Sequence, residues 1–203
     1  MSRLMVSALC VLLVAGCVSF PMPRTYVLGA PLDTSSPATG STPLNRIQLT
    51  SVSVPDYLDS EDILVRQGAH ELHTSTTGQW GERLSAGLTH ALSADLATHL
   101  PGYLVETGPP MDAMAWQLSV KVDSLDSWSD GHCVLSVQWT LRRAIGGAVQ
   151  LDGQAVLVGK AEASAIAGDA AVISGIAATV AQLADTLAHA VIGSAPSASP
   201  PRS

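Results

Sequence analysis

Histidine and acidic side chains offer the first possibility of chemistry in this sequence, because they can hold a metal ion. His70 and His73 lie three residues apart beside Glu71, and His132 precedes Cys133. Zinc requires ligands that converge on one point, whereas residues three apart on a strand point to opposite faces of a sheet. We therefore predict that these histidines are surface residues and that the chain holds no metal.

Cys133 could also act as a nucleophile, but its place in the sequence favours burial. It falls in phase with Leu135, Val137, Trp139 and Leu141, an alternation typical of one face of a strand. A thiol in such apolar surroundings keeps its proton and is unreactive. We predict a core thiol without a catalytic role.

The segment from Gly153 to Lys160 is similar to a phosphate-binding loop in composition only. Five residues separate its glycines where that motif has four, and Ala161 stands where a Ser or Thr would bind magnesium. The sequence also lacks the Gly-x-Ser-x-Gly elbow of many serine hydrolases. We therefore predict no catalytic residues and no cofactor.

Cys17 carries the strongest chemical signal. It follows Val14-Ala15-Gly16, and the apolar run from Leu4 to Ala15 has Arg3 as its only preceding charge. That run is much shorter than the ~20 residues that span a bilayer, so it is typical of a secretory signal. The motif resembles the lipobox of bacterial lipoproteins, in which the cysteine thiol receives a diacylglyceryl group. We predict that residues 1–16 are removed and that Cys17 is lipidated; the alternative is a plain secretory signal followed by an incidental cysteine.

Lipidation would fix the protein at a membrane surface. Each buried methylene contributes about 0.8 kcal/mol, so two or three acyl chains hold firmly where one does not. The residue after Cys17 is Val18, not an acidic residue. By resemblance to sorted lipoproteins, this implies the periplasmic face of the outer membrane.

Composition favours one folded domain and argues against nucleic-acid binding. Removal of 16 residues from the 203 leaves 187, enough for one domain with a sizeable core. The net charge is −7, with ten Lys and Arg against seventeen Asp and Glu, and no basic cluster could neutralise a row of phosphates. Once Cys10 is removed and Cys17 acylated, Cys133 has no partner for a disulfide.

Segments rich in Pro, Ser, Thr and Gly divide the mature chain. Such residues bury too little apolar surface to offset the entropy of ordering. We predict a lipidated tether at 17–23, a periplasmic domain at 24–192 with a flexible loop at 30–43, and a disordered tail at 193–203.

Hydrophobic periodicity predicts strands, a helix, more strands and a last helix within 24–192. The expected strands are Tyr26 to Leu28, Ile47 to Val54, Ile63 to His73, Trp116 to Val122, Cys133 to Leu141 and Gln150 to Lys160, with a hairpin turn at Gly146-Gly147. The expected helices are Trp80 to Leu100, ended by Pro101-Gly102, and Asp169 to Val191. Elements that are apolar on one side favour an α+β two-layer domain, with two amphipathic helices on one face of a mainly antiparallel sheet.

Aromatic and small residues refine this prediction. Trp80 should open the first helix and place its ring against the sheet, while Trp116 and Trp139 lie in phase with core positions. The last helix is rich in Ala, which fits either an oligomer contact or burial within its own domain.

Three short motifs in a fixed order resemble one known family. They are Val54-Pro55-Asp56-Tyr57-Leu58-Asp59, Ile63-Leu64-Val65-Arg66 and Trp80-Gly81-Glu82-Arg83-Leu84. Together they resemble the ABC-type transport auxiliary lipoprotein family. The matching positions, called the signature residues below, are Tyr26, Leu28, Pro55, Tyr57, Leu58, Arg66, Trp80, Leu84, Leu92 and Leu96.

The resemblance implies a scaffold or docking component of an intermembrane lipid transport system. Its expected partners are an MCE-domain protein, sometimes with an ABC permease, and further copies of itself in a ring; it implies no catalytic residues. Two other classes stay open: a lipoprotein hydrolase acting on envelope substrates, and a free-standing lipoprotein that assembles or maintains the outer membrane. A cleft holding a Ser or Cys beside a His would favour the hydrolase.

Overall fold

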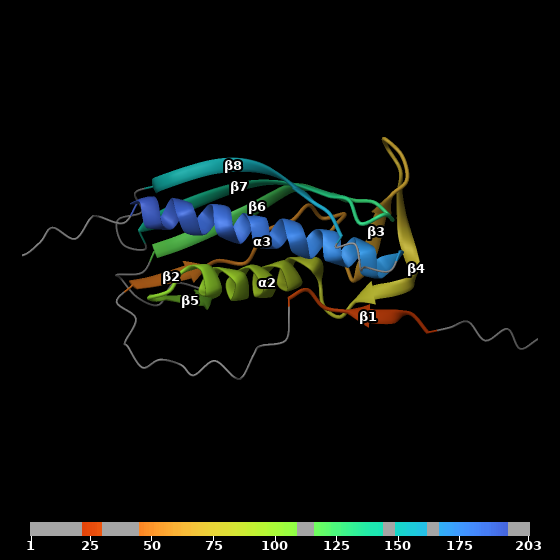
Figure 1. The fold of residues 1–203 in the computed structure, drawn as a ribbon, viewed down its shortest axis with the longest axis horizontal. Helices are drawn as coiled ribbons and strands as arrows, with labels where there is room; N and C mark the ends of the chain where they lie inside the picture. The colour runs from red at the N-terminus through yellow and green to blue at the C-terminus, as the bar shows by residue number, and fades with distance from the viewer. Residues whose placement is uncertain (1–21, 30–44, 109–115, 144–148, 162–166, 195–203) are drawn as a thin grey trace, which may run out of the picture.

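The computed structural model describes residues 22–29, 45–108, 116–143, 149–161 and 167–194 (Figure 1). The predicted signal, Cys17, the 30–43 loop and the Gly146-Gly147 turn lie outside these ranges. The elements follow one another as β1 (Arg24–Tyr26), β2 (Asn45–Leu49), β3 (Asp62–Arg66), β4 (Leu72–Trp80), α2 (Leu84–His99), β5 (Tyr103–Thr107), β6 (Trp116–Ser127), β7 (Cys133–Arg143), β8 (Val149–Gly159) and α3 (Asp169–Ser194).

The larger of two sheets contains five strands in the order β5-β2-β6-β7-β8. Its two longest pairings are antiparallel: β6 with β7, from Trp116↔Arg143 to Ser127↔Cys133, and β7 with β8 over nearly the whole of both strands. β2 lies parallel to β5 and β6, and the chain between β2 and β5 passes through α2, as parallel neighbours require a crossover. The sheet is therefore mainly antiparallel, with parallel pairs toward one edge.

A smaller sheet, with the order β1-β4-β3, lies at one end of the molecule (Figure 1). β1 is parallel to β4, and β3 is antiparallel to it. The Ser127 hydroxyl at the end of β6 donates a hydrogen bond to the Leu64 carbonyl oxygen of β3 (2.9 Å). This contact joins the two sheets.

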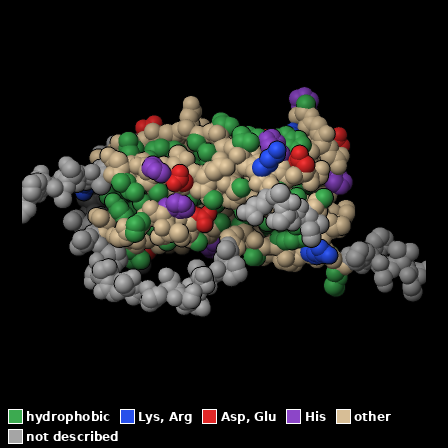
Figure 2. Space-filling view, viewed as in Figure 1, with side chains coloured by type: hydrophobic (Ala, Val, Ile, Leu, Met, Phe, Trp, Pro, Cys, Tyr) green, Lys and Arg blue, Asp and Glu red, His purple; other side chains and the backbone are tan. Residues whose placement is uncertain are grey.

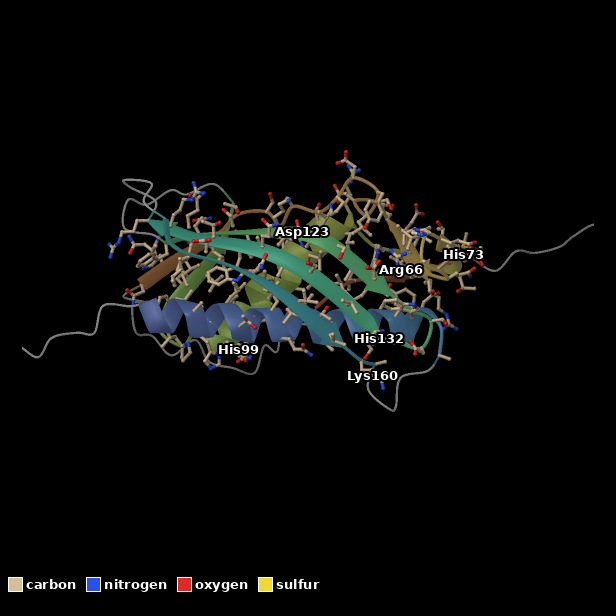
Figure 3. All side chains as sticks on the ribbon, turned by 90° about the horizontal axis from the view of Figure 1, so that it is seen from above. Arg66, His73, His99, Asp123, His132 and Lys160 are labelled. Atoms are coloured by element: carbon tan, nitrogen blue, oxygen red, sulfur yellow. The ribbon has the colours of Figure 1, made fainter. Side chains whose placement is uncertain are left out.

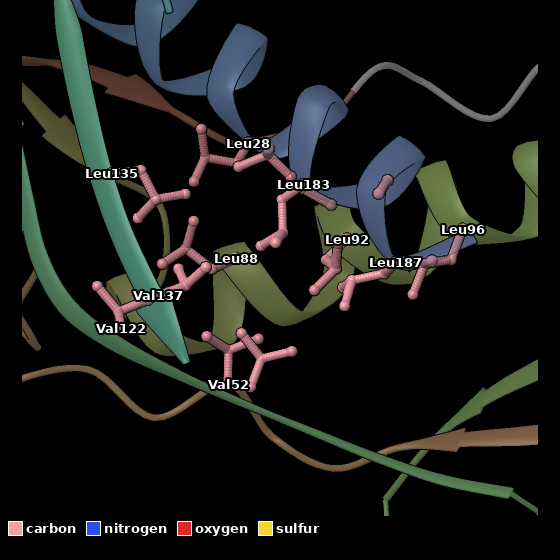
Figure 4. Packing of buried hydrophobic residues seen from close by; sticks show 14 of the residues in the cluster. Leu28, Val52, Leu88, Leu92, Leu96, Val122, Leu135, Val137, Leu183 and Leu187 are labelled. Carbon is pink, nitrogen blue, oxygen red and sulfur yellow. The ribbon is translucent and has the colours of Figure 1, made fainter. Parts of the chain in front are cut away.

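The core lies between the helices and one face of the larger sheet. One small cavity is lined by Leu88 and Leu92 of α2, Leu183 of α3, and Val122 and Leu135 of the sheet. Figure 4 shows how these side chains lie between the helices and the sheet. Because alternate residues of β6 and β7 point to this side, the opposite face of the sheet carries their polar side chains. The predicted α+β fold is confirmed.

The first helix begins later than the sequence predicts. The stripe of Leu84, Leu88, Leu92 and Leu96 is buried on α2 as expected, but Trp80 is the last residue of β4. The Trp80 backbone N–H donates to the Glu61 carbonyl oxygen (2.7 Å), and the residue is in register with Tyr26 of β1. The ring is buried as expected, but the prediction that Trp80 opens the helix is wrong. Pairing of Trp80 with the neighbouring strand overrides the helical preference that its four-residue spacing indicates.

The strand boundaries near the N-terminus also differ from the prediction. The segment from Ile63 to His73 forms two strands and not one. The backbone N–H of Gln67 donates a hydrogen bond to the Glu71 carbonyl oxygen (3.1 Å), which closes a turn between β3 and β4. β2 ends at Leu49, after which Ser53 alone forms an isolated bridge to β6. The sequence analysis also missed β5, a short strand without clear alternation of polar and apolar residues.

The last helix follows the prediction closely. α3 begins at Asp169, its stripe of Ile176, Val180, Leu183, Leu187 and Val191 is buried, and Ile173 packs partly against the core. The helix runs two residues into the predicted tail, and residues 195–203 lie outside the described ranges. It is long and apolar enough to cross a membrane, but half of its most apolar window is buried within the fold, as in a core helix.

Candidate functional site

Three of the signature residues, all of them buried, meet at the start of α2. Leu58, Trp80 and Leu84 are each at most 4% exposed. They line one small internal cavity of about 10 Å³ together with Ile176 of α3. Residues distant in the sequence therefore form one packed cluster that connects both helices to the smaller sheet.

The turn that contains Pro55 and Leu58 holds the N-terminus of α2. Arg83 is the N-cap residue, but its side chain makes no capping hydrogen bond. The Asp59 carboxylate instead accepts a hydrogen bond from the Ser85 backbone N–H (3.2 Å), and Arg83 donates to the Asp59 carbonyl oxygen (2.8 Å). Hydrogen bonds from Ser85 lower the pKa of Asp59, so a negative charge lies at the positive end of the helix.

Tyr26 and Leu28 bring the N-terminal segment onto the same region. Tyr26 is in register with Trp80, and its carbonyl oxygen accepts a hydrogen bond from the Gly81 backbone N–H (2.7 Å). Leu28 is buried and lies near Gly87 of α2. The early Tyr-x-Leu motif thus positions the chain beside α2.

Arg66 connects the smaller sheet to β6. Its guanidinium forms a two-contact ion pair with Asp126, with Nε donating at 2.6 Å, and also donates to the Gly68 and Ala69 carbonyl oxygens in the β3–β4 turn. Figure 3 shows Arg66 at the same end of the molecule as His73. The sequence analysis did not single out Asp126, since it lies 60 residues from Arg66 and no local pattern marks the pair.

Tyr57 differs from the other signature residues because its side chain is 50% exposed. It lies in the turn that holds α2, next to the buried Leu58. Among the signature residues, it is therefore the one whose side chain is available to a partner.

A shallow cavity of about 530 Å³ lies between α2 and the ends of β2 and β5, and it tests the hydrolase alternative. Ser51, Ser85 and His90 line it, and His90 Nδ1 lies 3.1 Å from Glu82 Oε1. The Ser85 side chain, however, is hydrogen-bonded to Asp59. Within the described ranges, no hydrogen bond joins a serine to His90, so a nucleophile and base pair is not assembled.

An apolar groove of about 500 Å³ lies between α2, α3 and the segment after β1. Tyr26, Leu28, Ala91 and Ala177 contribute to its walls, and Asp95 is its acidic residue. Burial raises the pKa of the Asp95 carboxyl group. The groove is therefore suited to an apolar surface more than to a charged ligand.

His70 and His73 are surface residues as predicted, whereas His132 is only partly exposed, and Cys133 lies in the core as predicted. His132 packs against the Trp128 ring, with centroids 4.9 Å apart. In the described part of the chain, no three His, Cys, Asp or Glu residues lie close enough to hold a metal. Cys133 is fully buried, and desolvation raises the pKa of its thiol to about 12, so it is not a nucleophile at neutral pH.

The remaining predicted segments have structural roles. Gly153 to Gly159 belongs to strand β8, not to a phosphate loop, and Gly153 leaves room for the Trp139 ring. Trp139 and Trp116 pack partly against the core, and Arg143 stacks over Trp116 at 4.7 Å from the ring centroid.

The visible charges do not form a basic surface. On the face drawn in Figure 2, Lys and Arg side chains are few and well separated. Two of the described histidines lie beside acidic side chains, His90 beside Glu82 (3.1 Å) and His189 beside Asp185 (3.4 Å). This agrees with the net charge of −7.

Comparisons with known proteins identify the family to which the chain is similar. The family model described as "ABC-type transport auxiliary lipoprotein component" matches residues 26–188. The intermembrane transport lipoproteins PqiC of Escherichia coli (strain K12) and Shigella flexneri are each 26% identical over 127 residues, covering 63% of this chain and 67% of the relative.

Solved structures share the fold. The crystal structure of an uncharacterized protein has a TM-score of 0.67 at 21% identity, covering 84% of this chain and 99% of the other. A Xanthomonas campestris protein has a TM-score of 0.61 at 14% identity, covering 86% and 94%. Because the family model spans every element from the end of β1 into the last turns of α3, the chain belongs to the family of ABC-type transport auxiliary lipoprotein components.

Proposed function

We propose that this protein is an outer-membrane-anchored scaffold in an intermembrane lipid transport system, where it contacts an MCE-domain partner. The family match over residues 26–188 carries the proposal, since it runs through both layers of the fold. A general role in transport follows from the family. The membrane, the lipid cargo and the MCE-domain partner are the proposed parts.

The role of the signature residues supports a scaffold. Leu58, Trp80 and Leu84 pack together, and Arg66 ties the smaller sheet to the larger. These signature residues stabilise the fold and do not form a reaction centre. Such residues fit a protein that acts by offering a binding surface to a partner.

Tyr57 and the apolar groove are the proposed contact regions. Tyr57 exposes half of an aromatic side chain, and aromatic residues are enriched where proteins bind one another. The groove offers apolar walls from α3, including Ala177. Both lie on elements held rigidly at the start of α2 or along α3.

Anchoring through Cys17 would allow these contacts to be weak individually. A lipidated protein is confined to the membrane surface, which raises its effective concentration near a partner that ends there. High intrinsic affinity is then unnecessary for assembly.

The test is site-specific crosslinking in intact cell envelopes. A photoreactive amino acid at Tyr57 should capture an MCE-domain protein, whereas the same group at exposed Gln138 on the opposite sheet face should not. In parallel, the purified protein is assayed with ester and peptide substrates. The proposal fails if no MCE-domain protein is captured while turnover appears and is abolished by Ser85→Ala or His90→Ala.

A further inference from the structure

Two cavities adjoin at the end of the molecule that carries β1. The first, of about 360 Å³, lies between β1, β4 and the start of α3, and the second is the apolar groove between α2 and α3. Tyr26 and Ala170 line both, so the two cavities meet at these residues. Figure 1 shows β1, β4 and the start of α3 at the same end, with α2 and α3 running away from it side by side.

The first cavity, called the polar pocket below, brings a cation and an anion to one place. Arg24 and Asp169 both line it. Within the described ranges, neither forms an ion pair with the other or with a third group. The Asp169 carboxylate accepts a hydrogen bond from the Thr77 hydroxyl (2.6 Å), which holds it in position. Opposite charges that face one cavity without pairing complement a ligand that carries both charges.

The backbone at Gly78 leaves room for this arrangement. A Cβ atom there would lie 2.6 Å from Asp169 Oδ2 and 2.9 Å from Tyr26 Cε2. Arg24 is in register with Gly78 on the neighbouring strand. The carboxylate, the aromatic ring and the arginine therefore come together around one glycine, which joins the polar pocket to the start of the groove.

The groove has the length of one acyl chain. Its α3 wall runs from Ala170 to Ala181, which is about 16 Å at 1.5 Å per residue. That is close to half of the roughly 30 Å hydrocarbon core of a bilayer, the thickness that one acyl chain spans. Most of the lining residues are apolar, and Val27 is 63% exposed, so apolar surface stays in water until a ligand covers it.

The width of the groove admits one chain and not two. Its volume of about 500 Å³ over about 16 Å corresponds to a mean cross-section of about 30 Å². Apolar groups in contact lie about 4.5 Å apart, so one chain needs about 20 Å² and two need about 40 Å². A diacyl lipid would leave its second chain outside the groove.

We propose that the two cavities together bind one lysophospholipid with a phosphoethanolamine headgroup. Arg24 donates hydrogen bonds to the phosphate, and Asp169 accepts them from the ammonium group. The single acyl chain passes Tyr26 and lies along the groove toward Ala181. A diacyl phospholipid is the poorer ligand, because its second chain stays in water or in a bilayer.

The site lies near the proposed anchor. Met22 lines the polar pocket, and the extended chain from Cys17 to Met22 spans at most about 18 Å. The polar pocket is therefore within reach of the membrane surface at which Cys17 is proposed to be held. The role of a bound lipid rests on the proposed transport function, but the binding itself needs no MCE-domain partner. Its failure would leave capture of that partner at Tyr57 unaffected.

Equilibrium binding of radiolabelled palmitoyl-lysophosphatidylethanolamine tests the site. The protein is the mature chain from residue 17 with Cys17→Ala, so that its own acyl chains cannot occupy the groove, and the lipid is kept below its micelle concentration. The chain should bind one lipid, and it should bind palmitoyl-lysophosphatidylglycerol, which lacks the ammonium group, about fivefold more weakly. Dipalmitoylphosphatidylethanolamine in vesicles should not displace the bound lipid.

Variants of the polar pocket test the two charges. Arg24→Gln should weaken binding of the phosphoethanolamine lipid about fivefold, whereas Arg46→Gln, at an exposed arginine of β2, should leave it unchanged. Asp169→Asn should weaken binding of the phosphoethanolamine lipid and strengthen binding of the phosphoglycerol lipid, because the amide no longer repels an anionic headgroup. Asn is also well suited to the start of a helix, so this variant should fold.

Ala177→Phe tests the groove, because its ring fills the space of the acyl chain. It should weaken binding of both lysophospholipids at least about tenfold. Ala97→Phe is the matched control, at an exposed residue of α2 that does not line the groove. Melting temperatures equal to that of the wild type would show that each variant is folded.

Three results would overturn the proposal. The first is no saturable binding of the phosphoethanolamine lipid by the wild-type cavities. The second is displacement of that lipid by the diacyl vesicles, or equal affinity for the two headgroups. The third is binding that a folded Ala177→Phe variant leaves unchanged, or equal effects of Arg24→Gln and Arg46→Gln. The comparison of lipids on unaltered cavities decides the matter even if a variant fails to fold.

Discussion

Arg66 is the signature residue whose side chain makes the most specific contacts. Its guanidinium and the Asp126 carboxylate are 19% and 21% exposed, so water screens the ion pair only partly. We expect Arg66→Ala to lower the free energy of unfolding by about 2–3 kcal/mol, because it leaves the Asp126 charge without a partner. Urea denaturation of the variant and the wild type measures the difference.

Lys121 and Asp123 supply the matched control for Arg66. Their Nζ–Oδ1 distance is 3.0 Å, but the Lys121 side chain is 63% exposed. Lys121→Ala should change the free energy of unfolding by less than about 1 kcal/mol. Equal effects of Arg66→Ala and Lys121→Ala would show that Arg66 does not brace the two sheets.

Cys133 should make stability depend on pH in the alkaline range. The thiol pKa is about 12 in the folded protein, against an ordinary value of 9.0. The unfolded thiol loses its proton first, so the free energy of unfolding should fall between pH 9 and pH 12, by about 1 kcal/mol per pH unit. Denaturation at pH 8 and pH 10.5 should show this slope to be smaller in Cys133→Ala. The same slope in both proteins would exclude Cys133 as its source.

At the scale of elements, the packing of α3 depends on backbone contact at Gly175. A Cβ atom there would lie 2.1 Å from the Gly131 carbonyl oxygen, and one at Gly159 would lie 2.4 Å from the Gly175 carbonyl oxygen. We expect Gly175→Ala to lower the free energy of unfolding by about 1–3 kcal/mol, because the helix must move away from the β6–β7 turn. Thermal unfolding measures the effect.

Gly193 on the same helix is the control. A Cβ atom there meets nothing within 4 Å. Gly193→Ala should leave stability unchanged or raise it slightly, because Ala favours helix by up to about 1 kcal/mol. A loss as large as that of Gly175→Ala would point to a general sensitivity of α3 and not to the close approach.

Sequence periodicity predicted the elements that bury one regular stripe. The leucines of α2, the alternating residues of β6 and β7 and the stripe of α3 all follow from local spacing. Trp80 shows where this fails: its spacing fits a helix, but pairing with Tyr26 holds it in β4. The short β5 depends on β2 as its neighbour, and local sequence carries no sign of that pairing.

The candidate site was less predictable for the same reason. The family resemblance marked Leu58, Trp80 and Leu84, but their convergence around one cavity requires the tertiary fold. The Asp59 carboxylate caps a helix that begins 25 residues later, with no local capping pattern to indicate it. Long-range polar contacts of this kind leave little trace in one sequence.

At the scale of the whole molecule, we propose that the folded scaffold is attached to a membrane through its N-terminal anchor. The fold presents Tyr57 and the apolar groove on braced elements, and Cys17 is proposed to hold them at the membrane. The two parts can be separated experimentally, since Cys17 precedes the family-matched residues 26–188 in the sequence. The anchor should therefore change where the protein acts without changing its stability.

The most direct measurement compares capture of the MCE-domain partner by the anchored protein and by a soluble form. The soluble form carries Cys17→Ala behind an ordinary cleavable secretory signal, and both carry the photoreactive group at Tyr57. If the protein is a membrane-anchored scaffold, the two forms should have equal melting temperatures, and the soluble form should capture at least about tenfold less partner. Equal capture by both forms, or capture of no MCE-domain protein by the anchored form, would contradict the account.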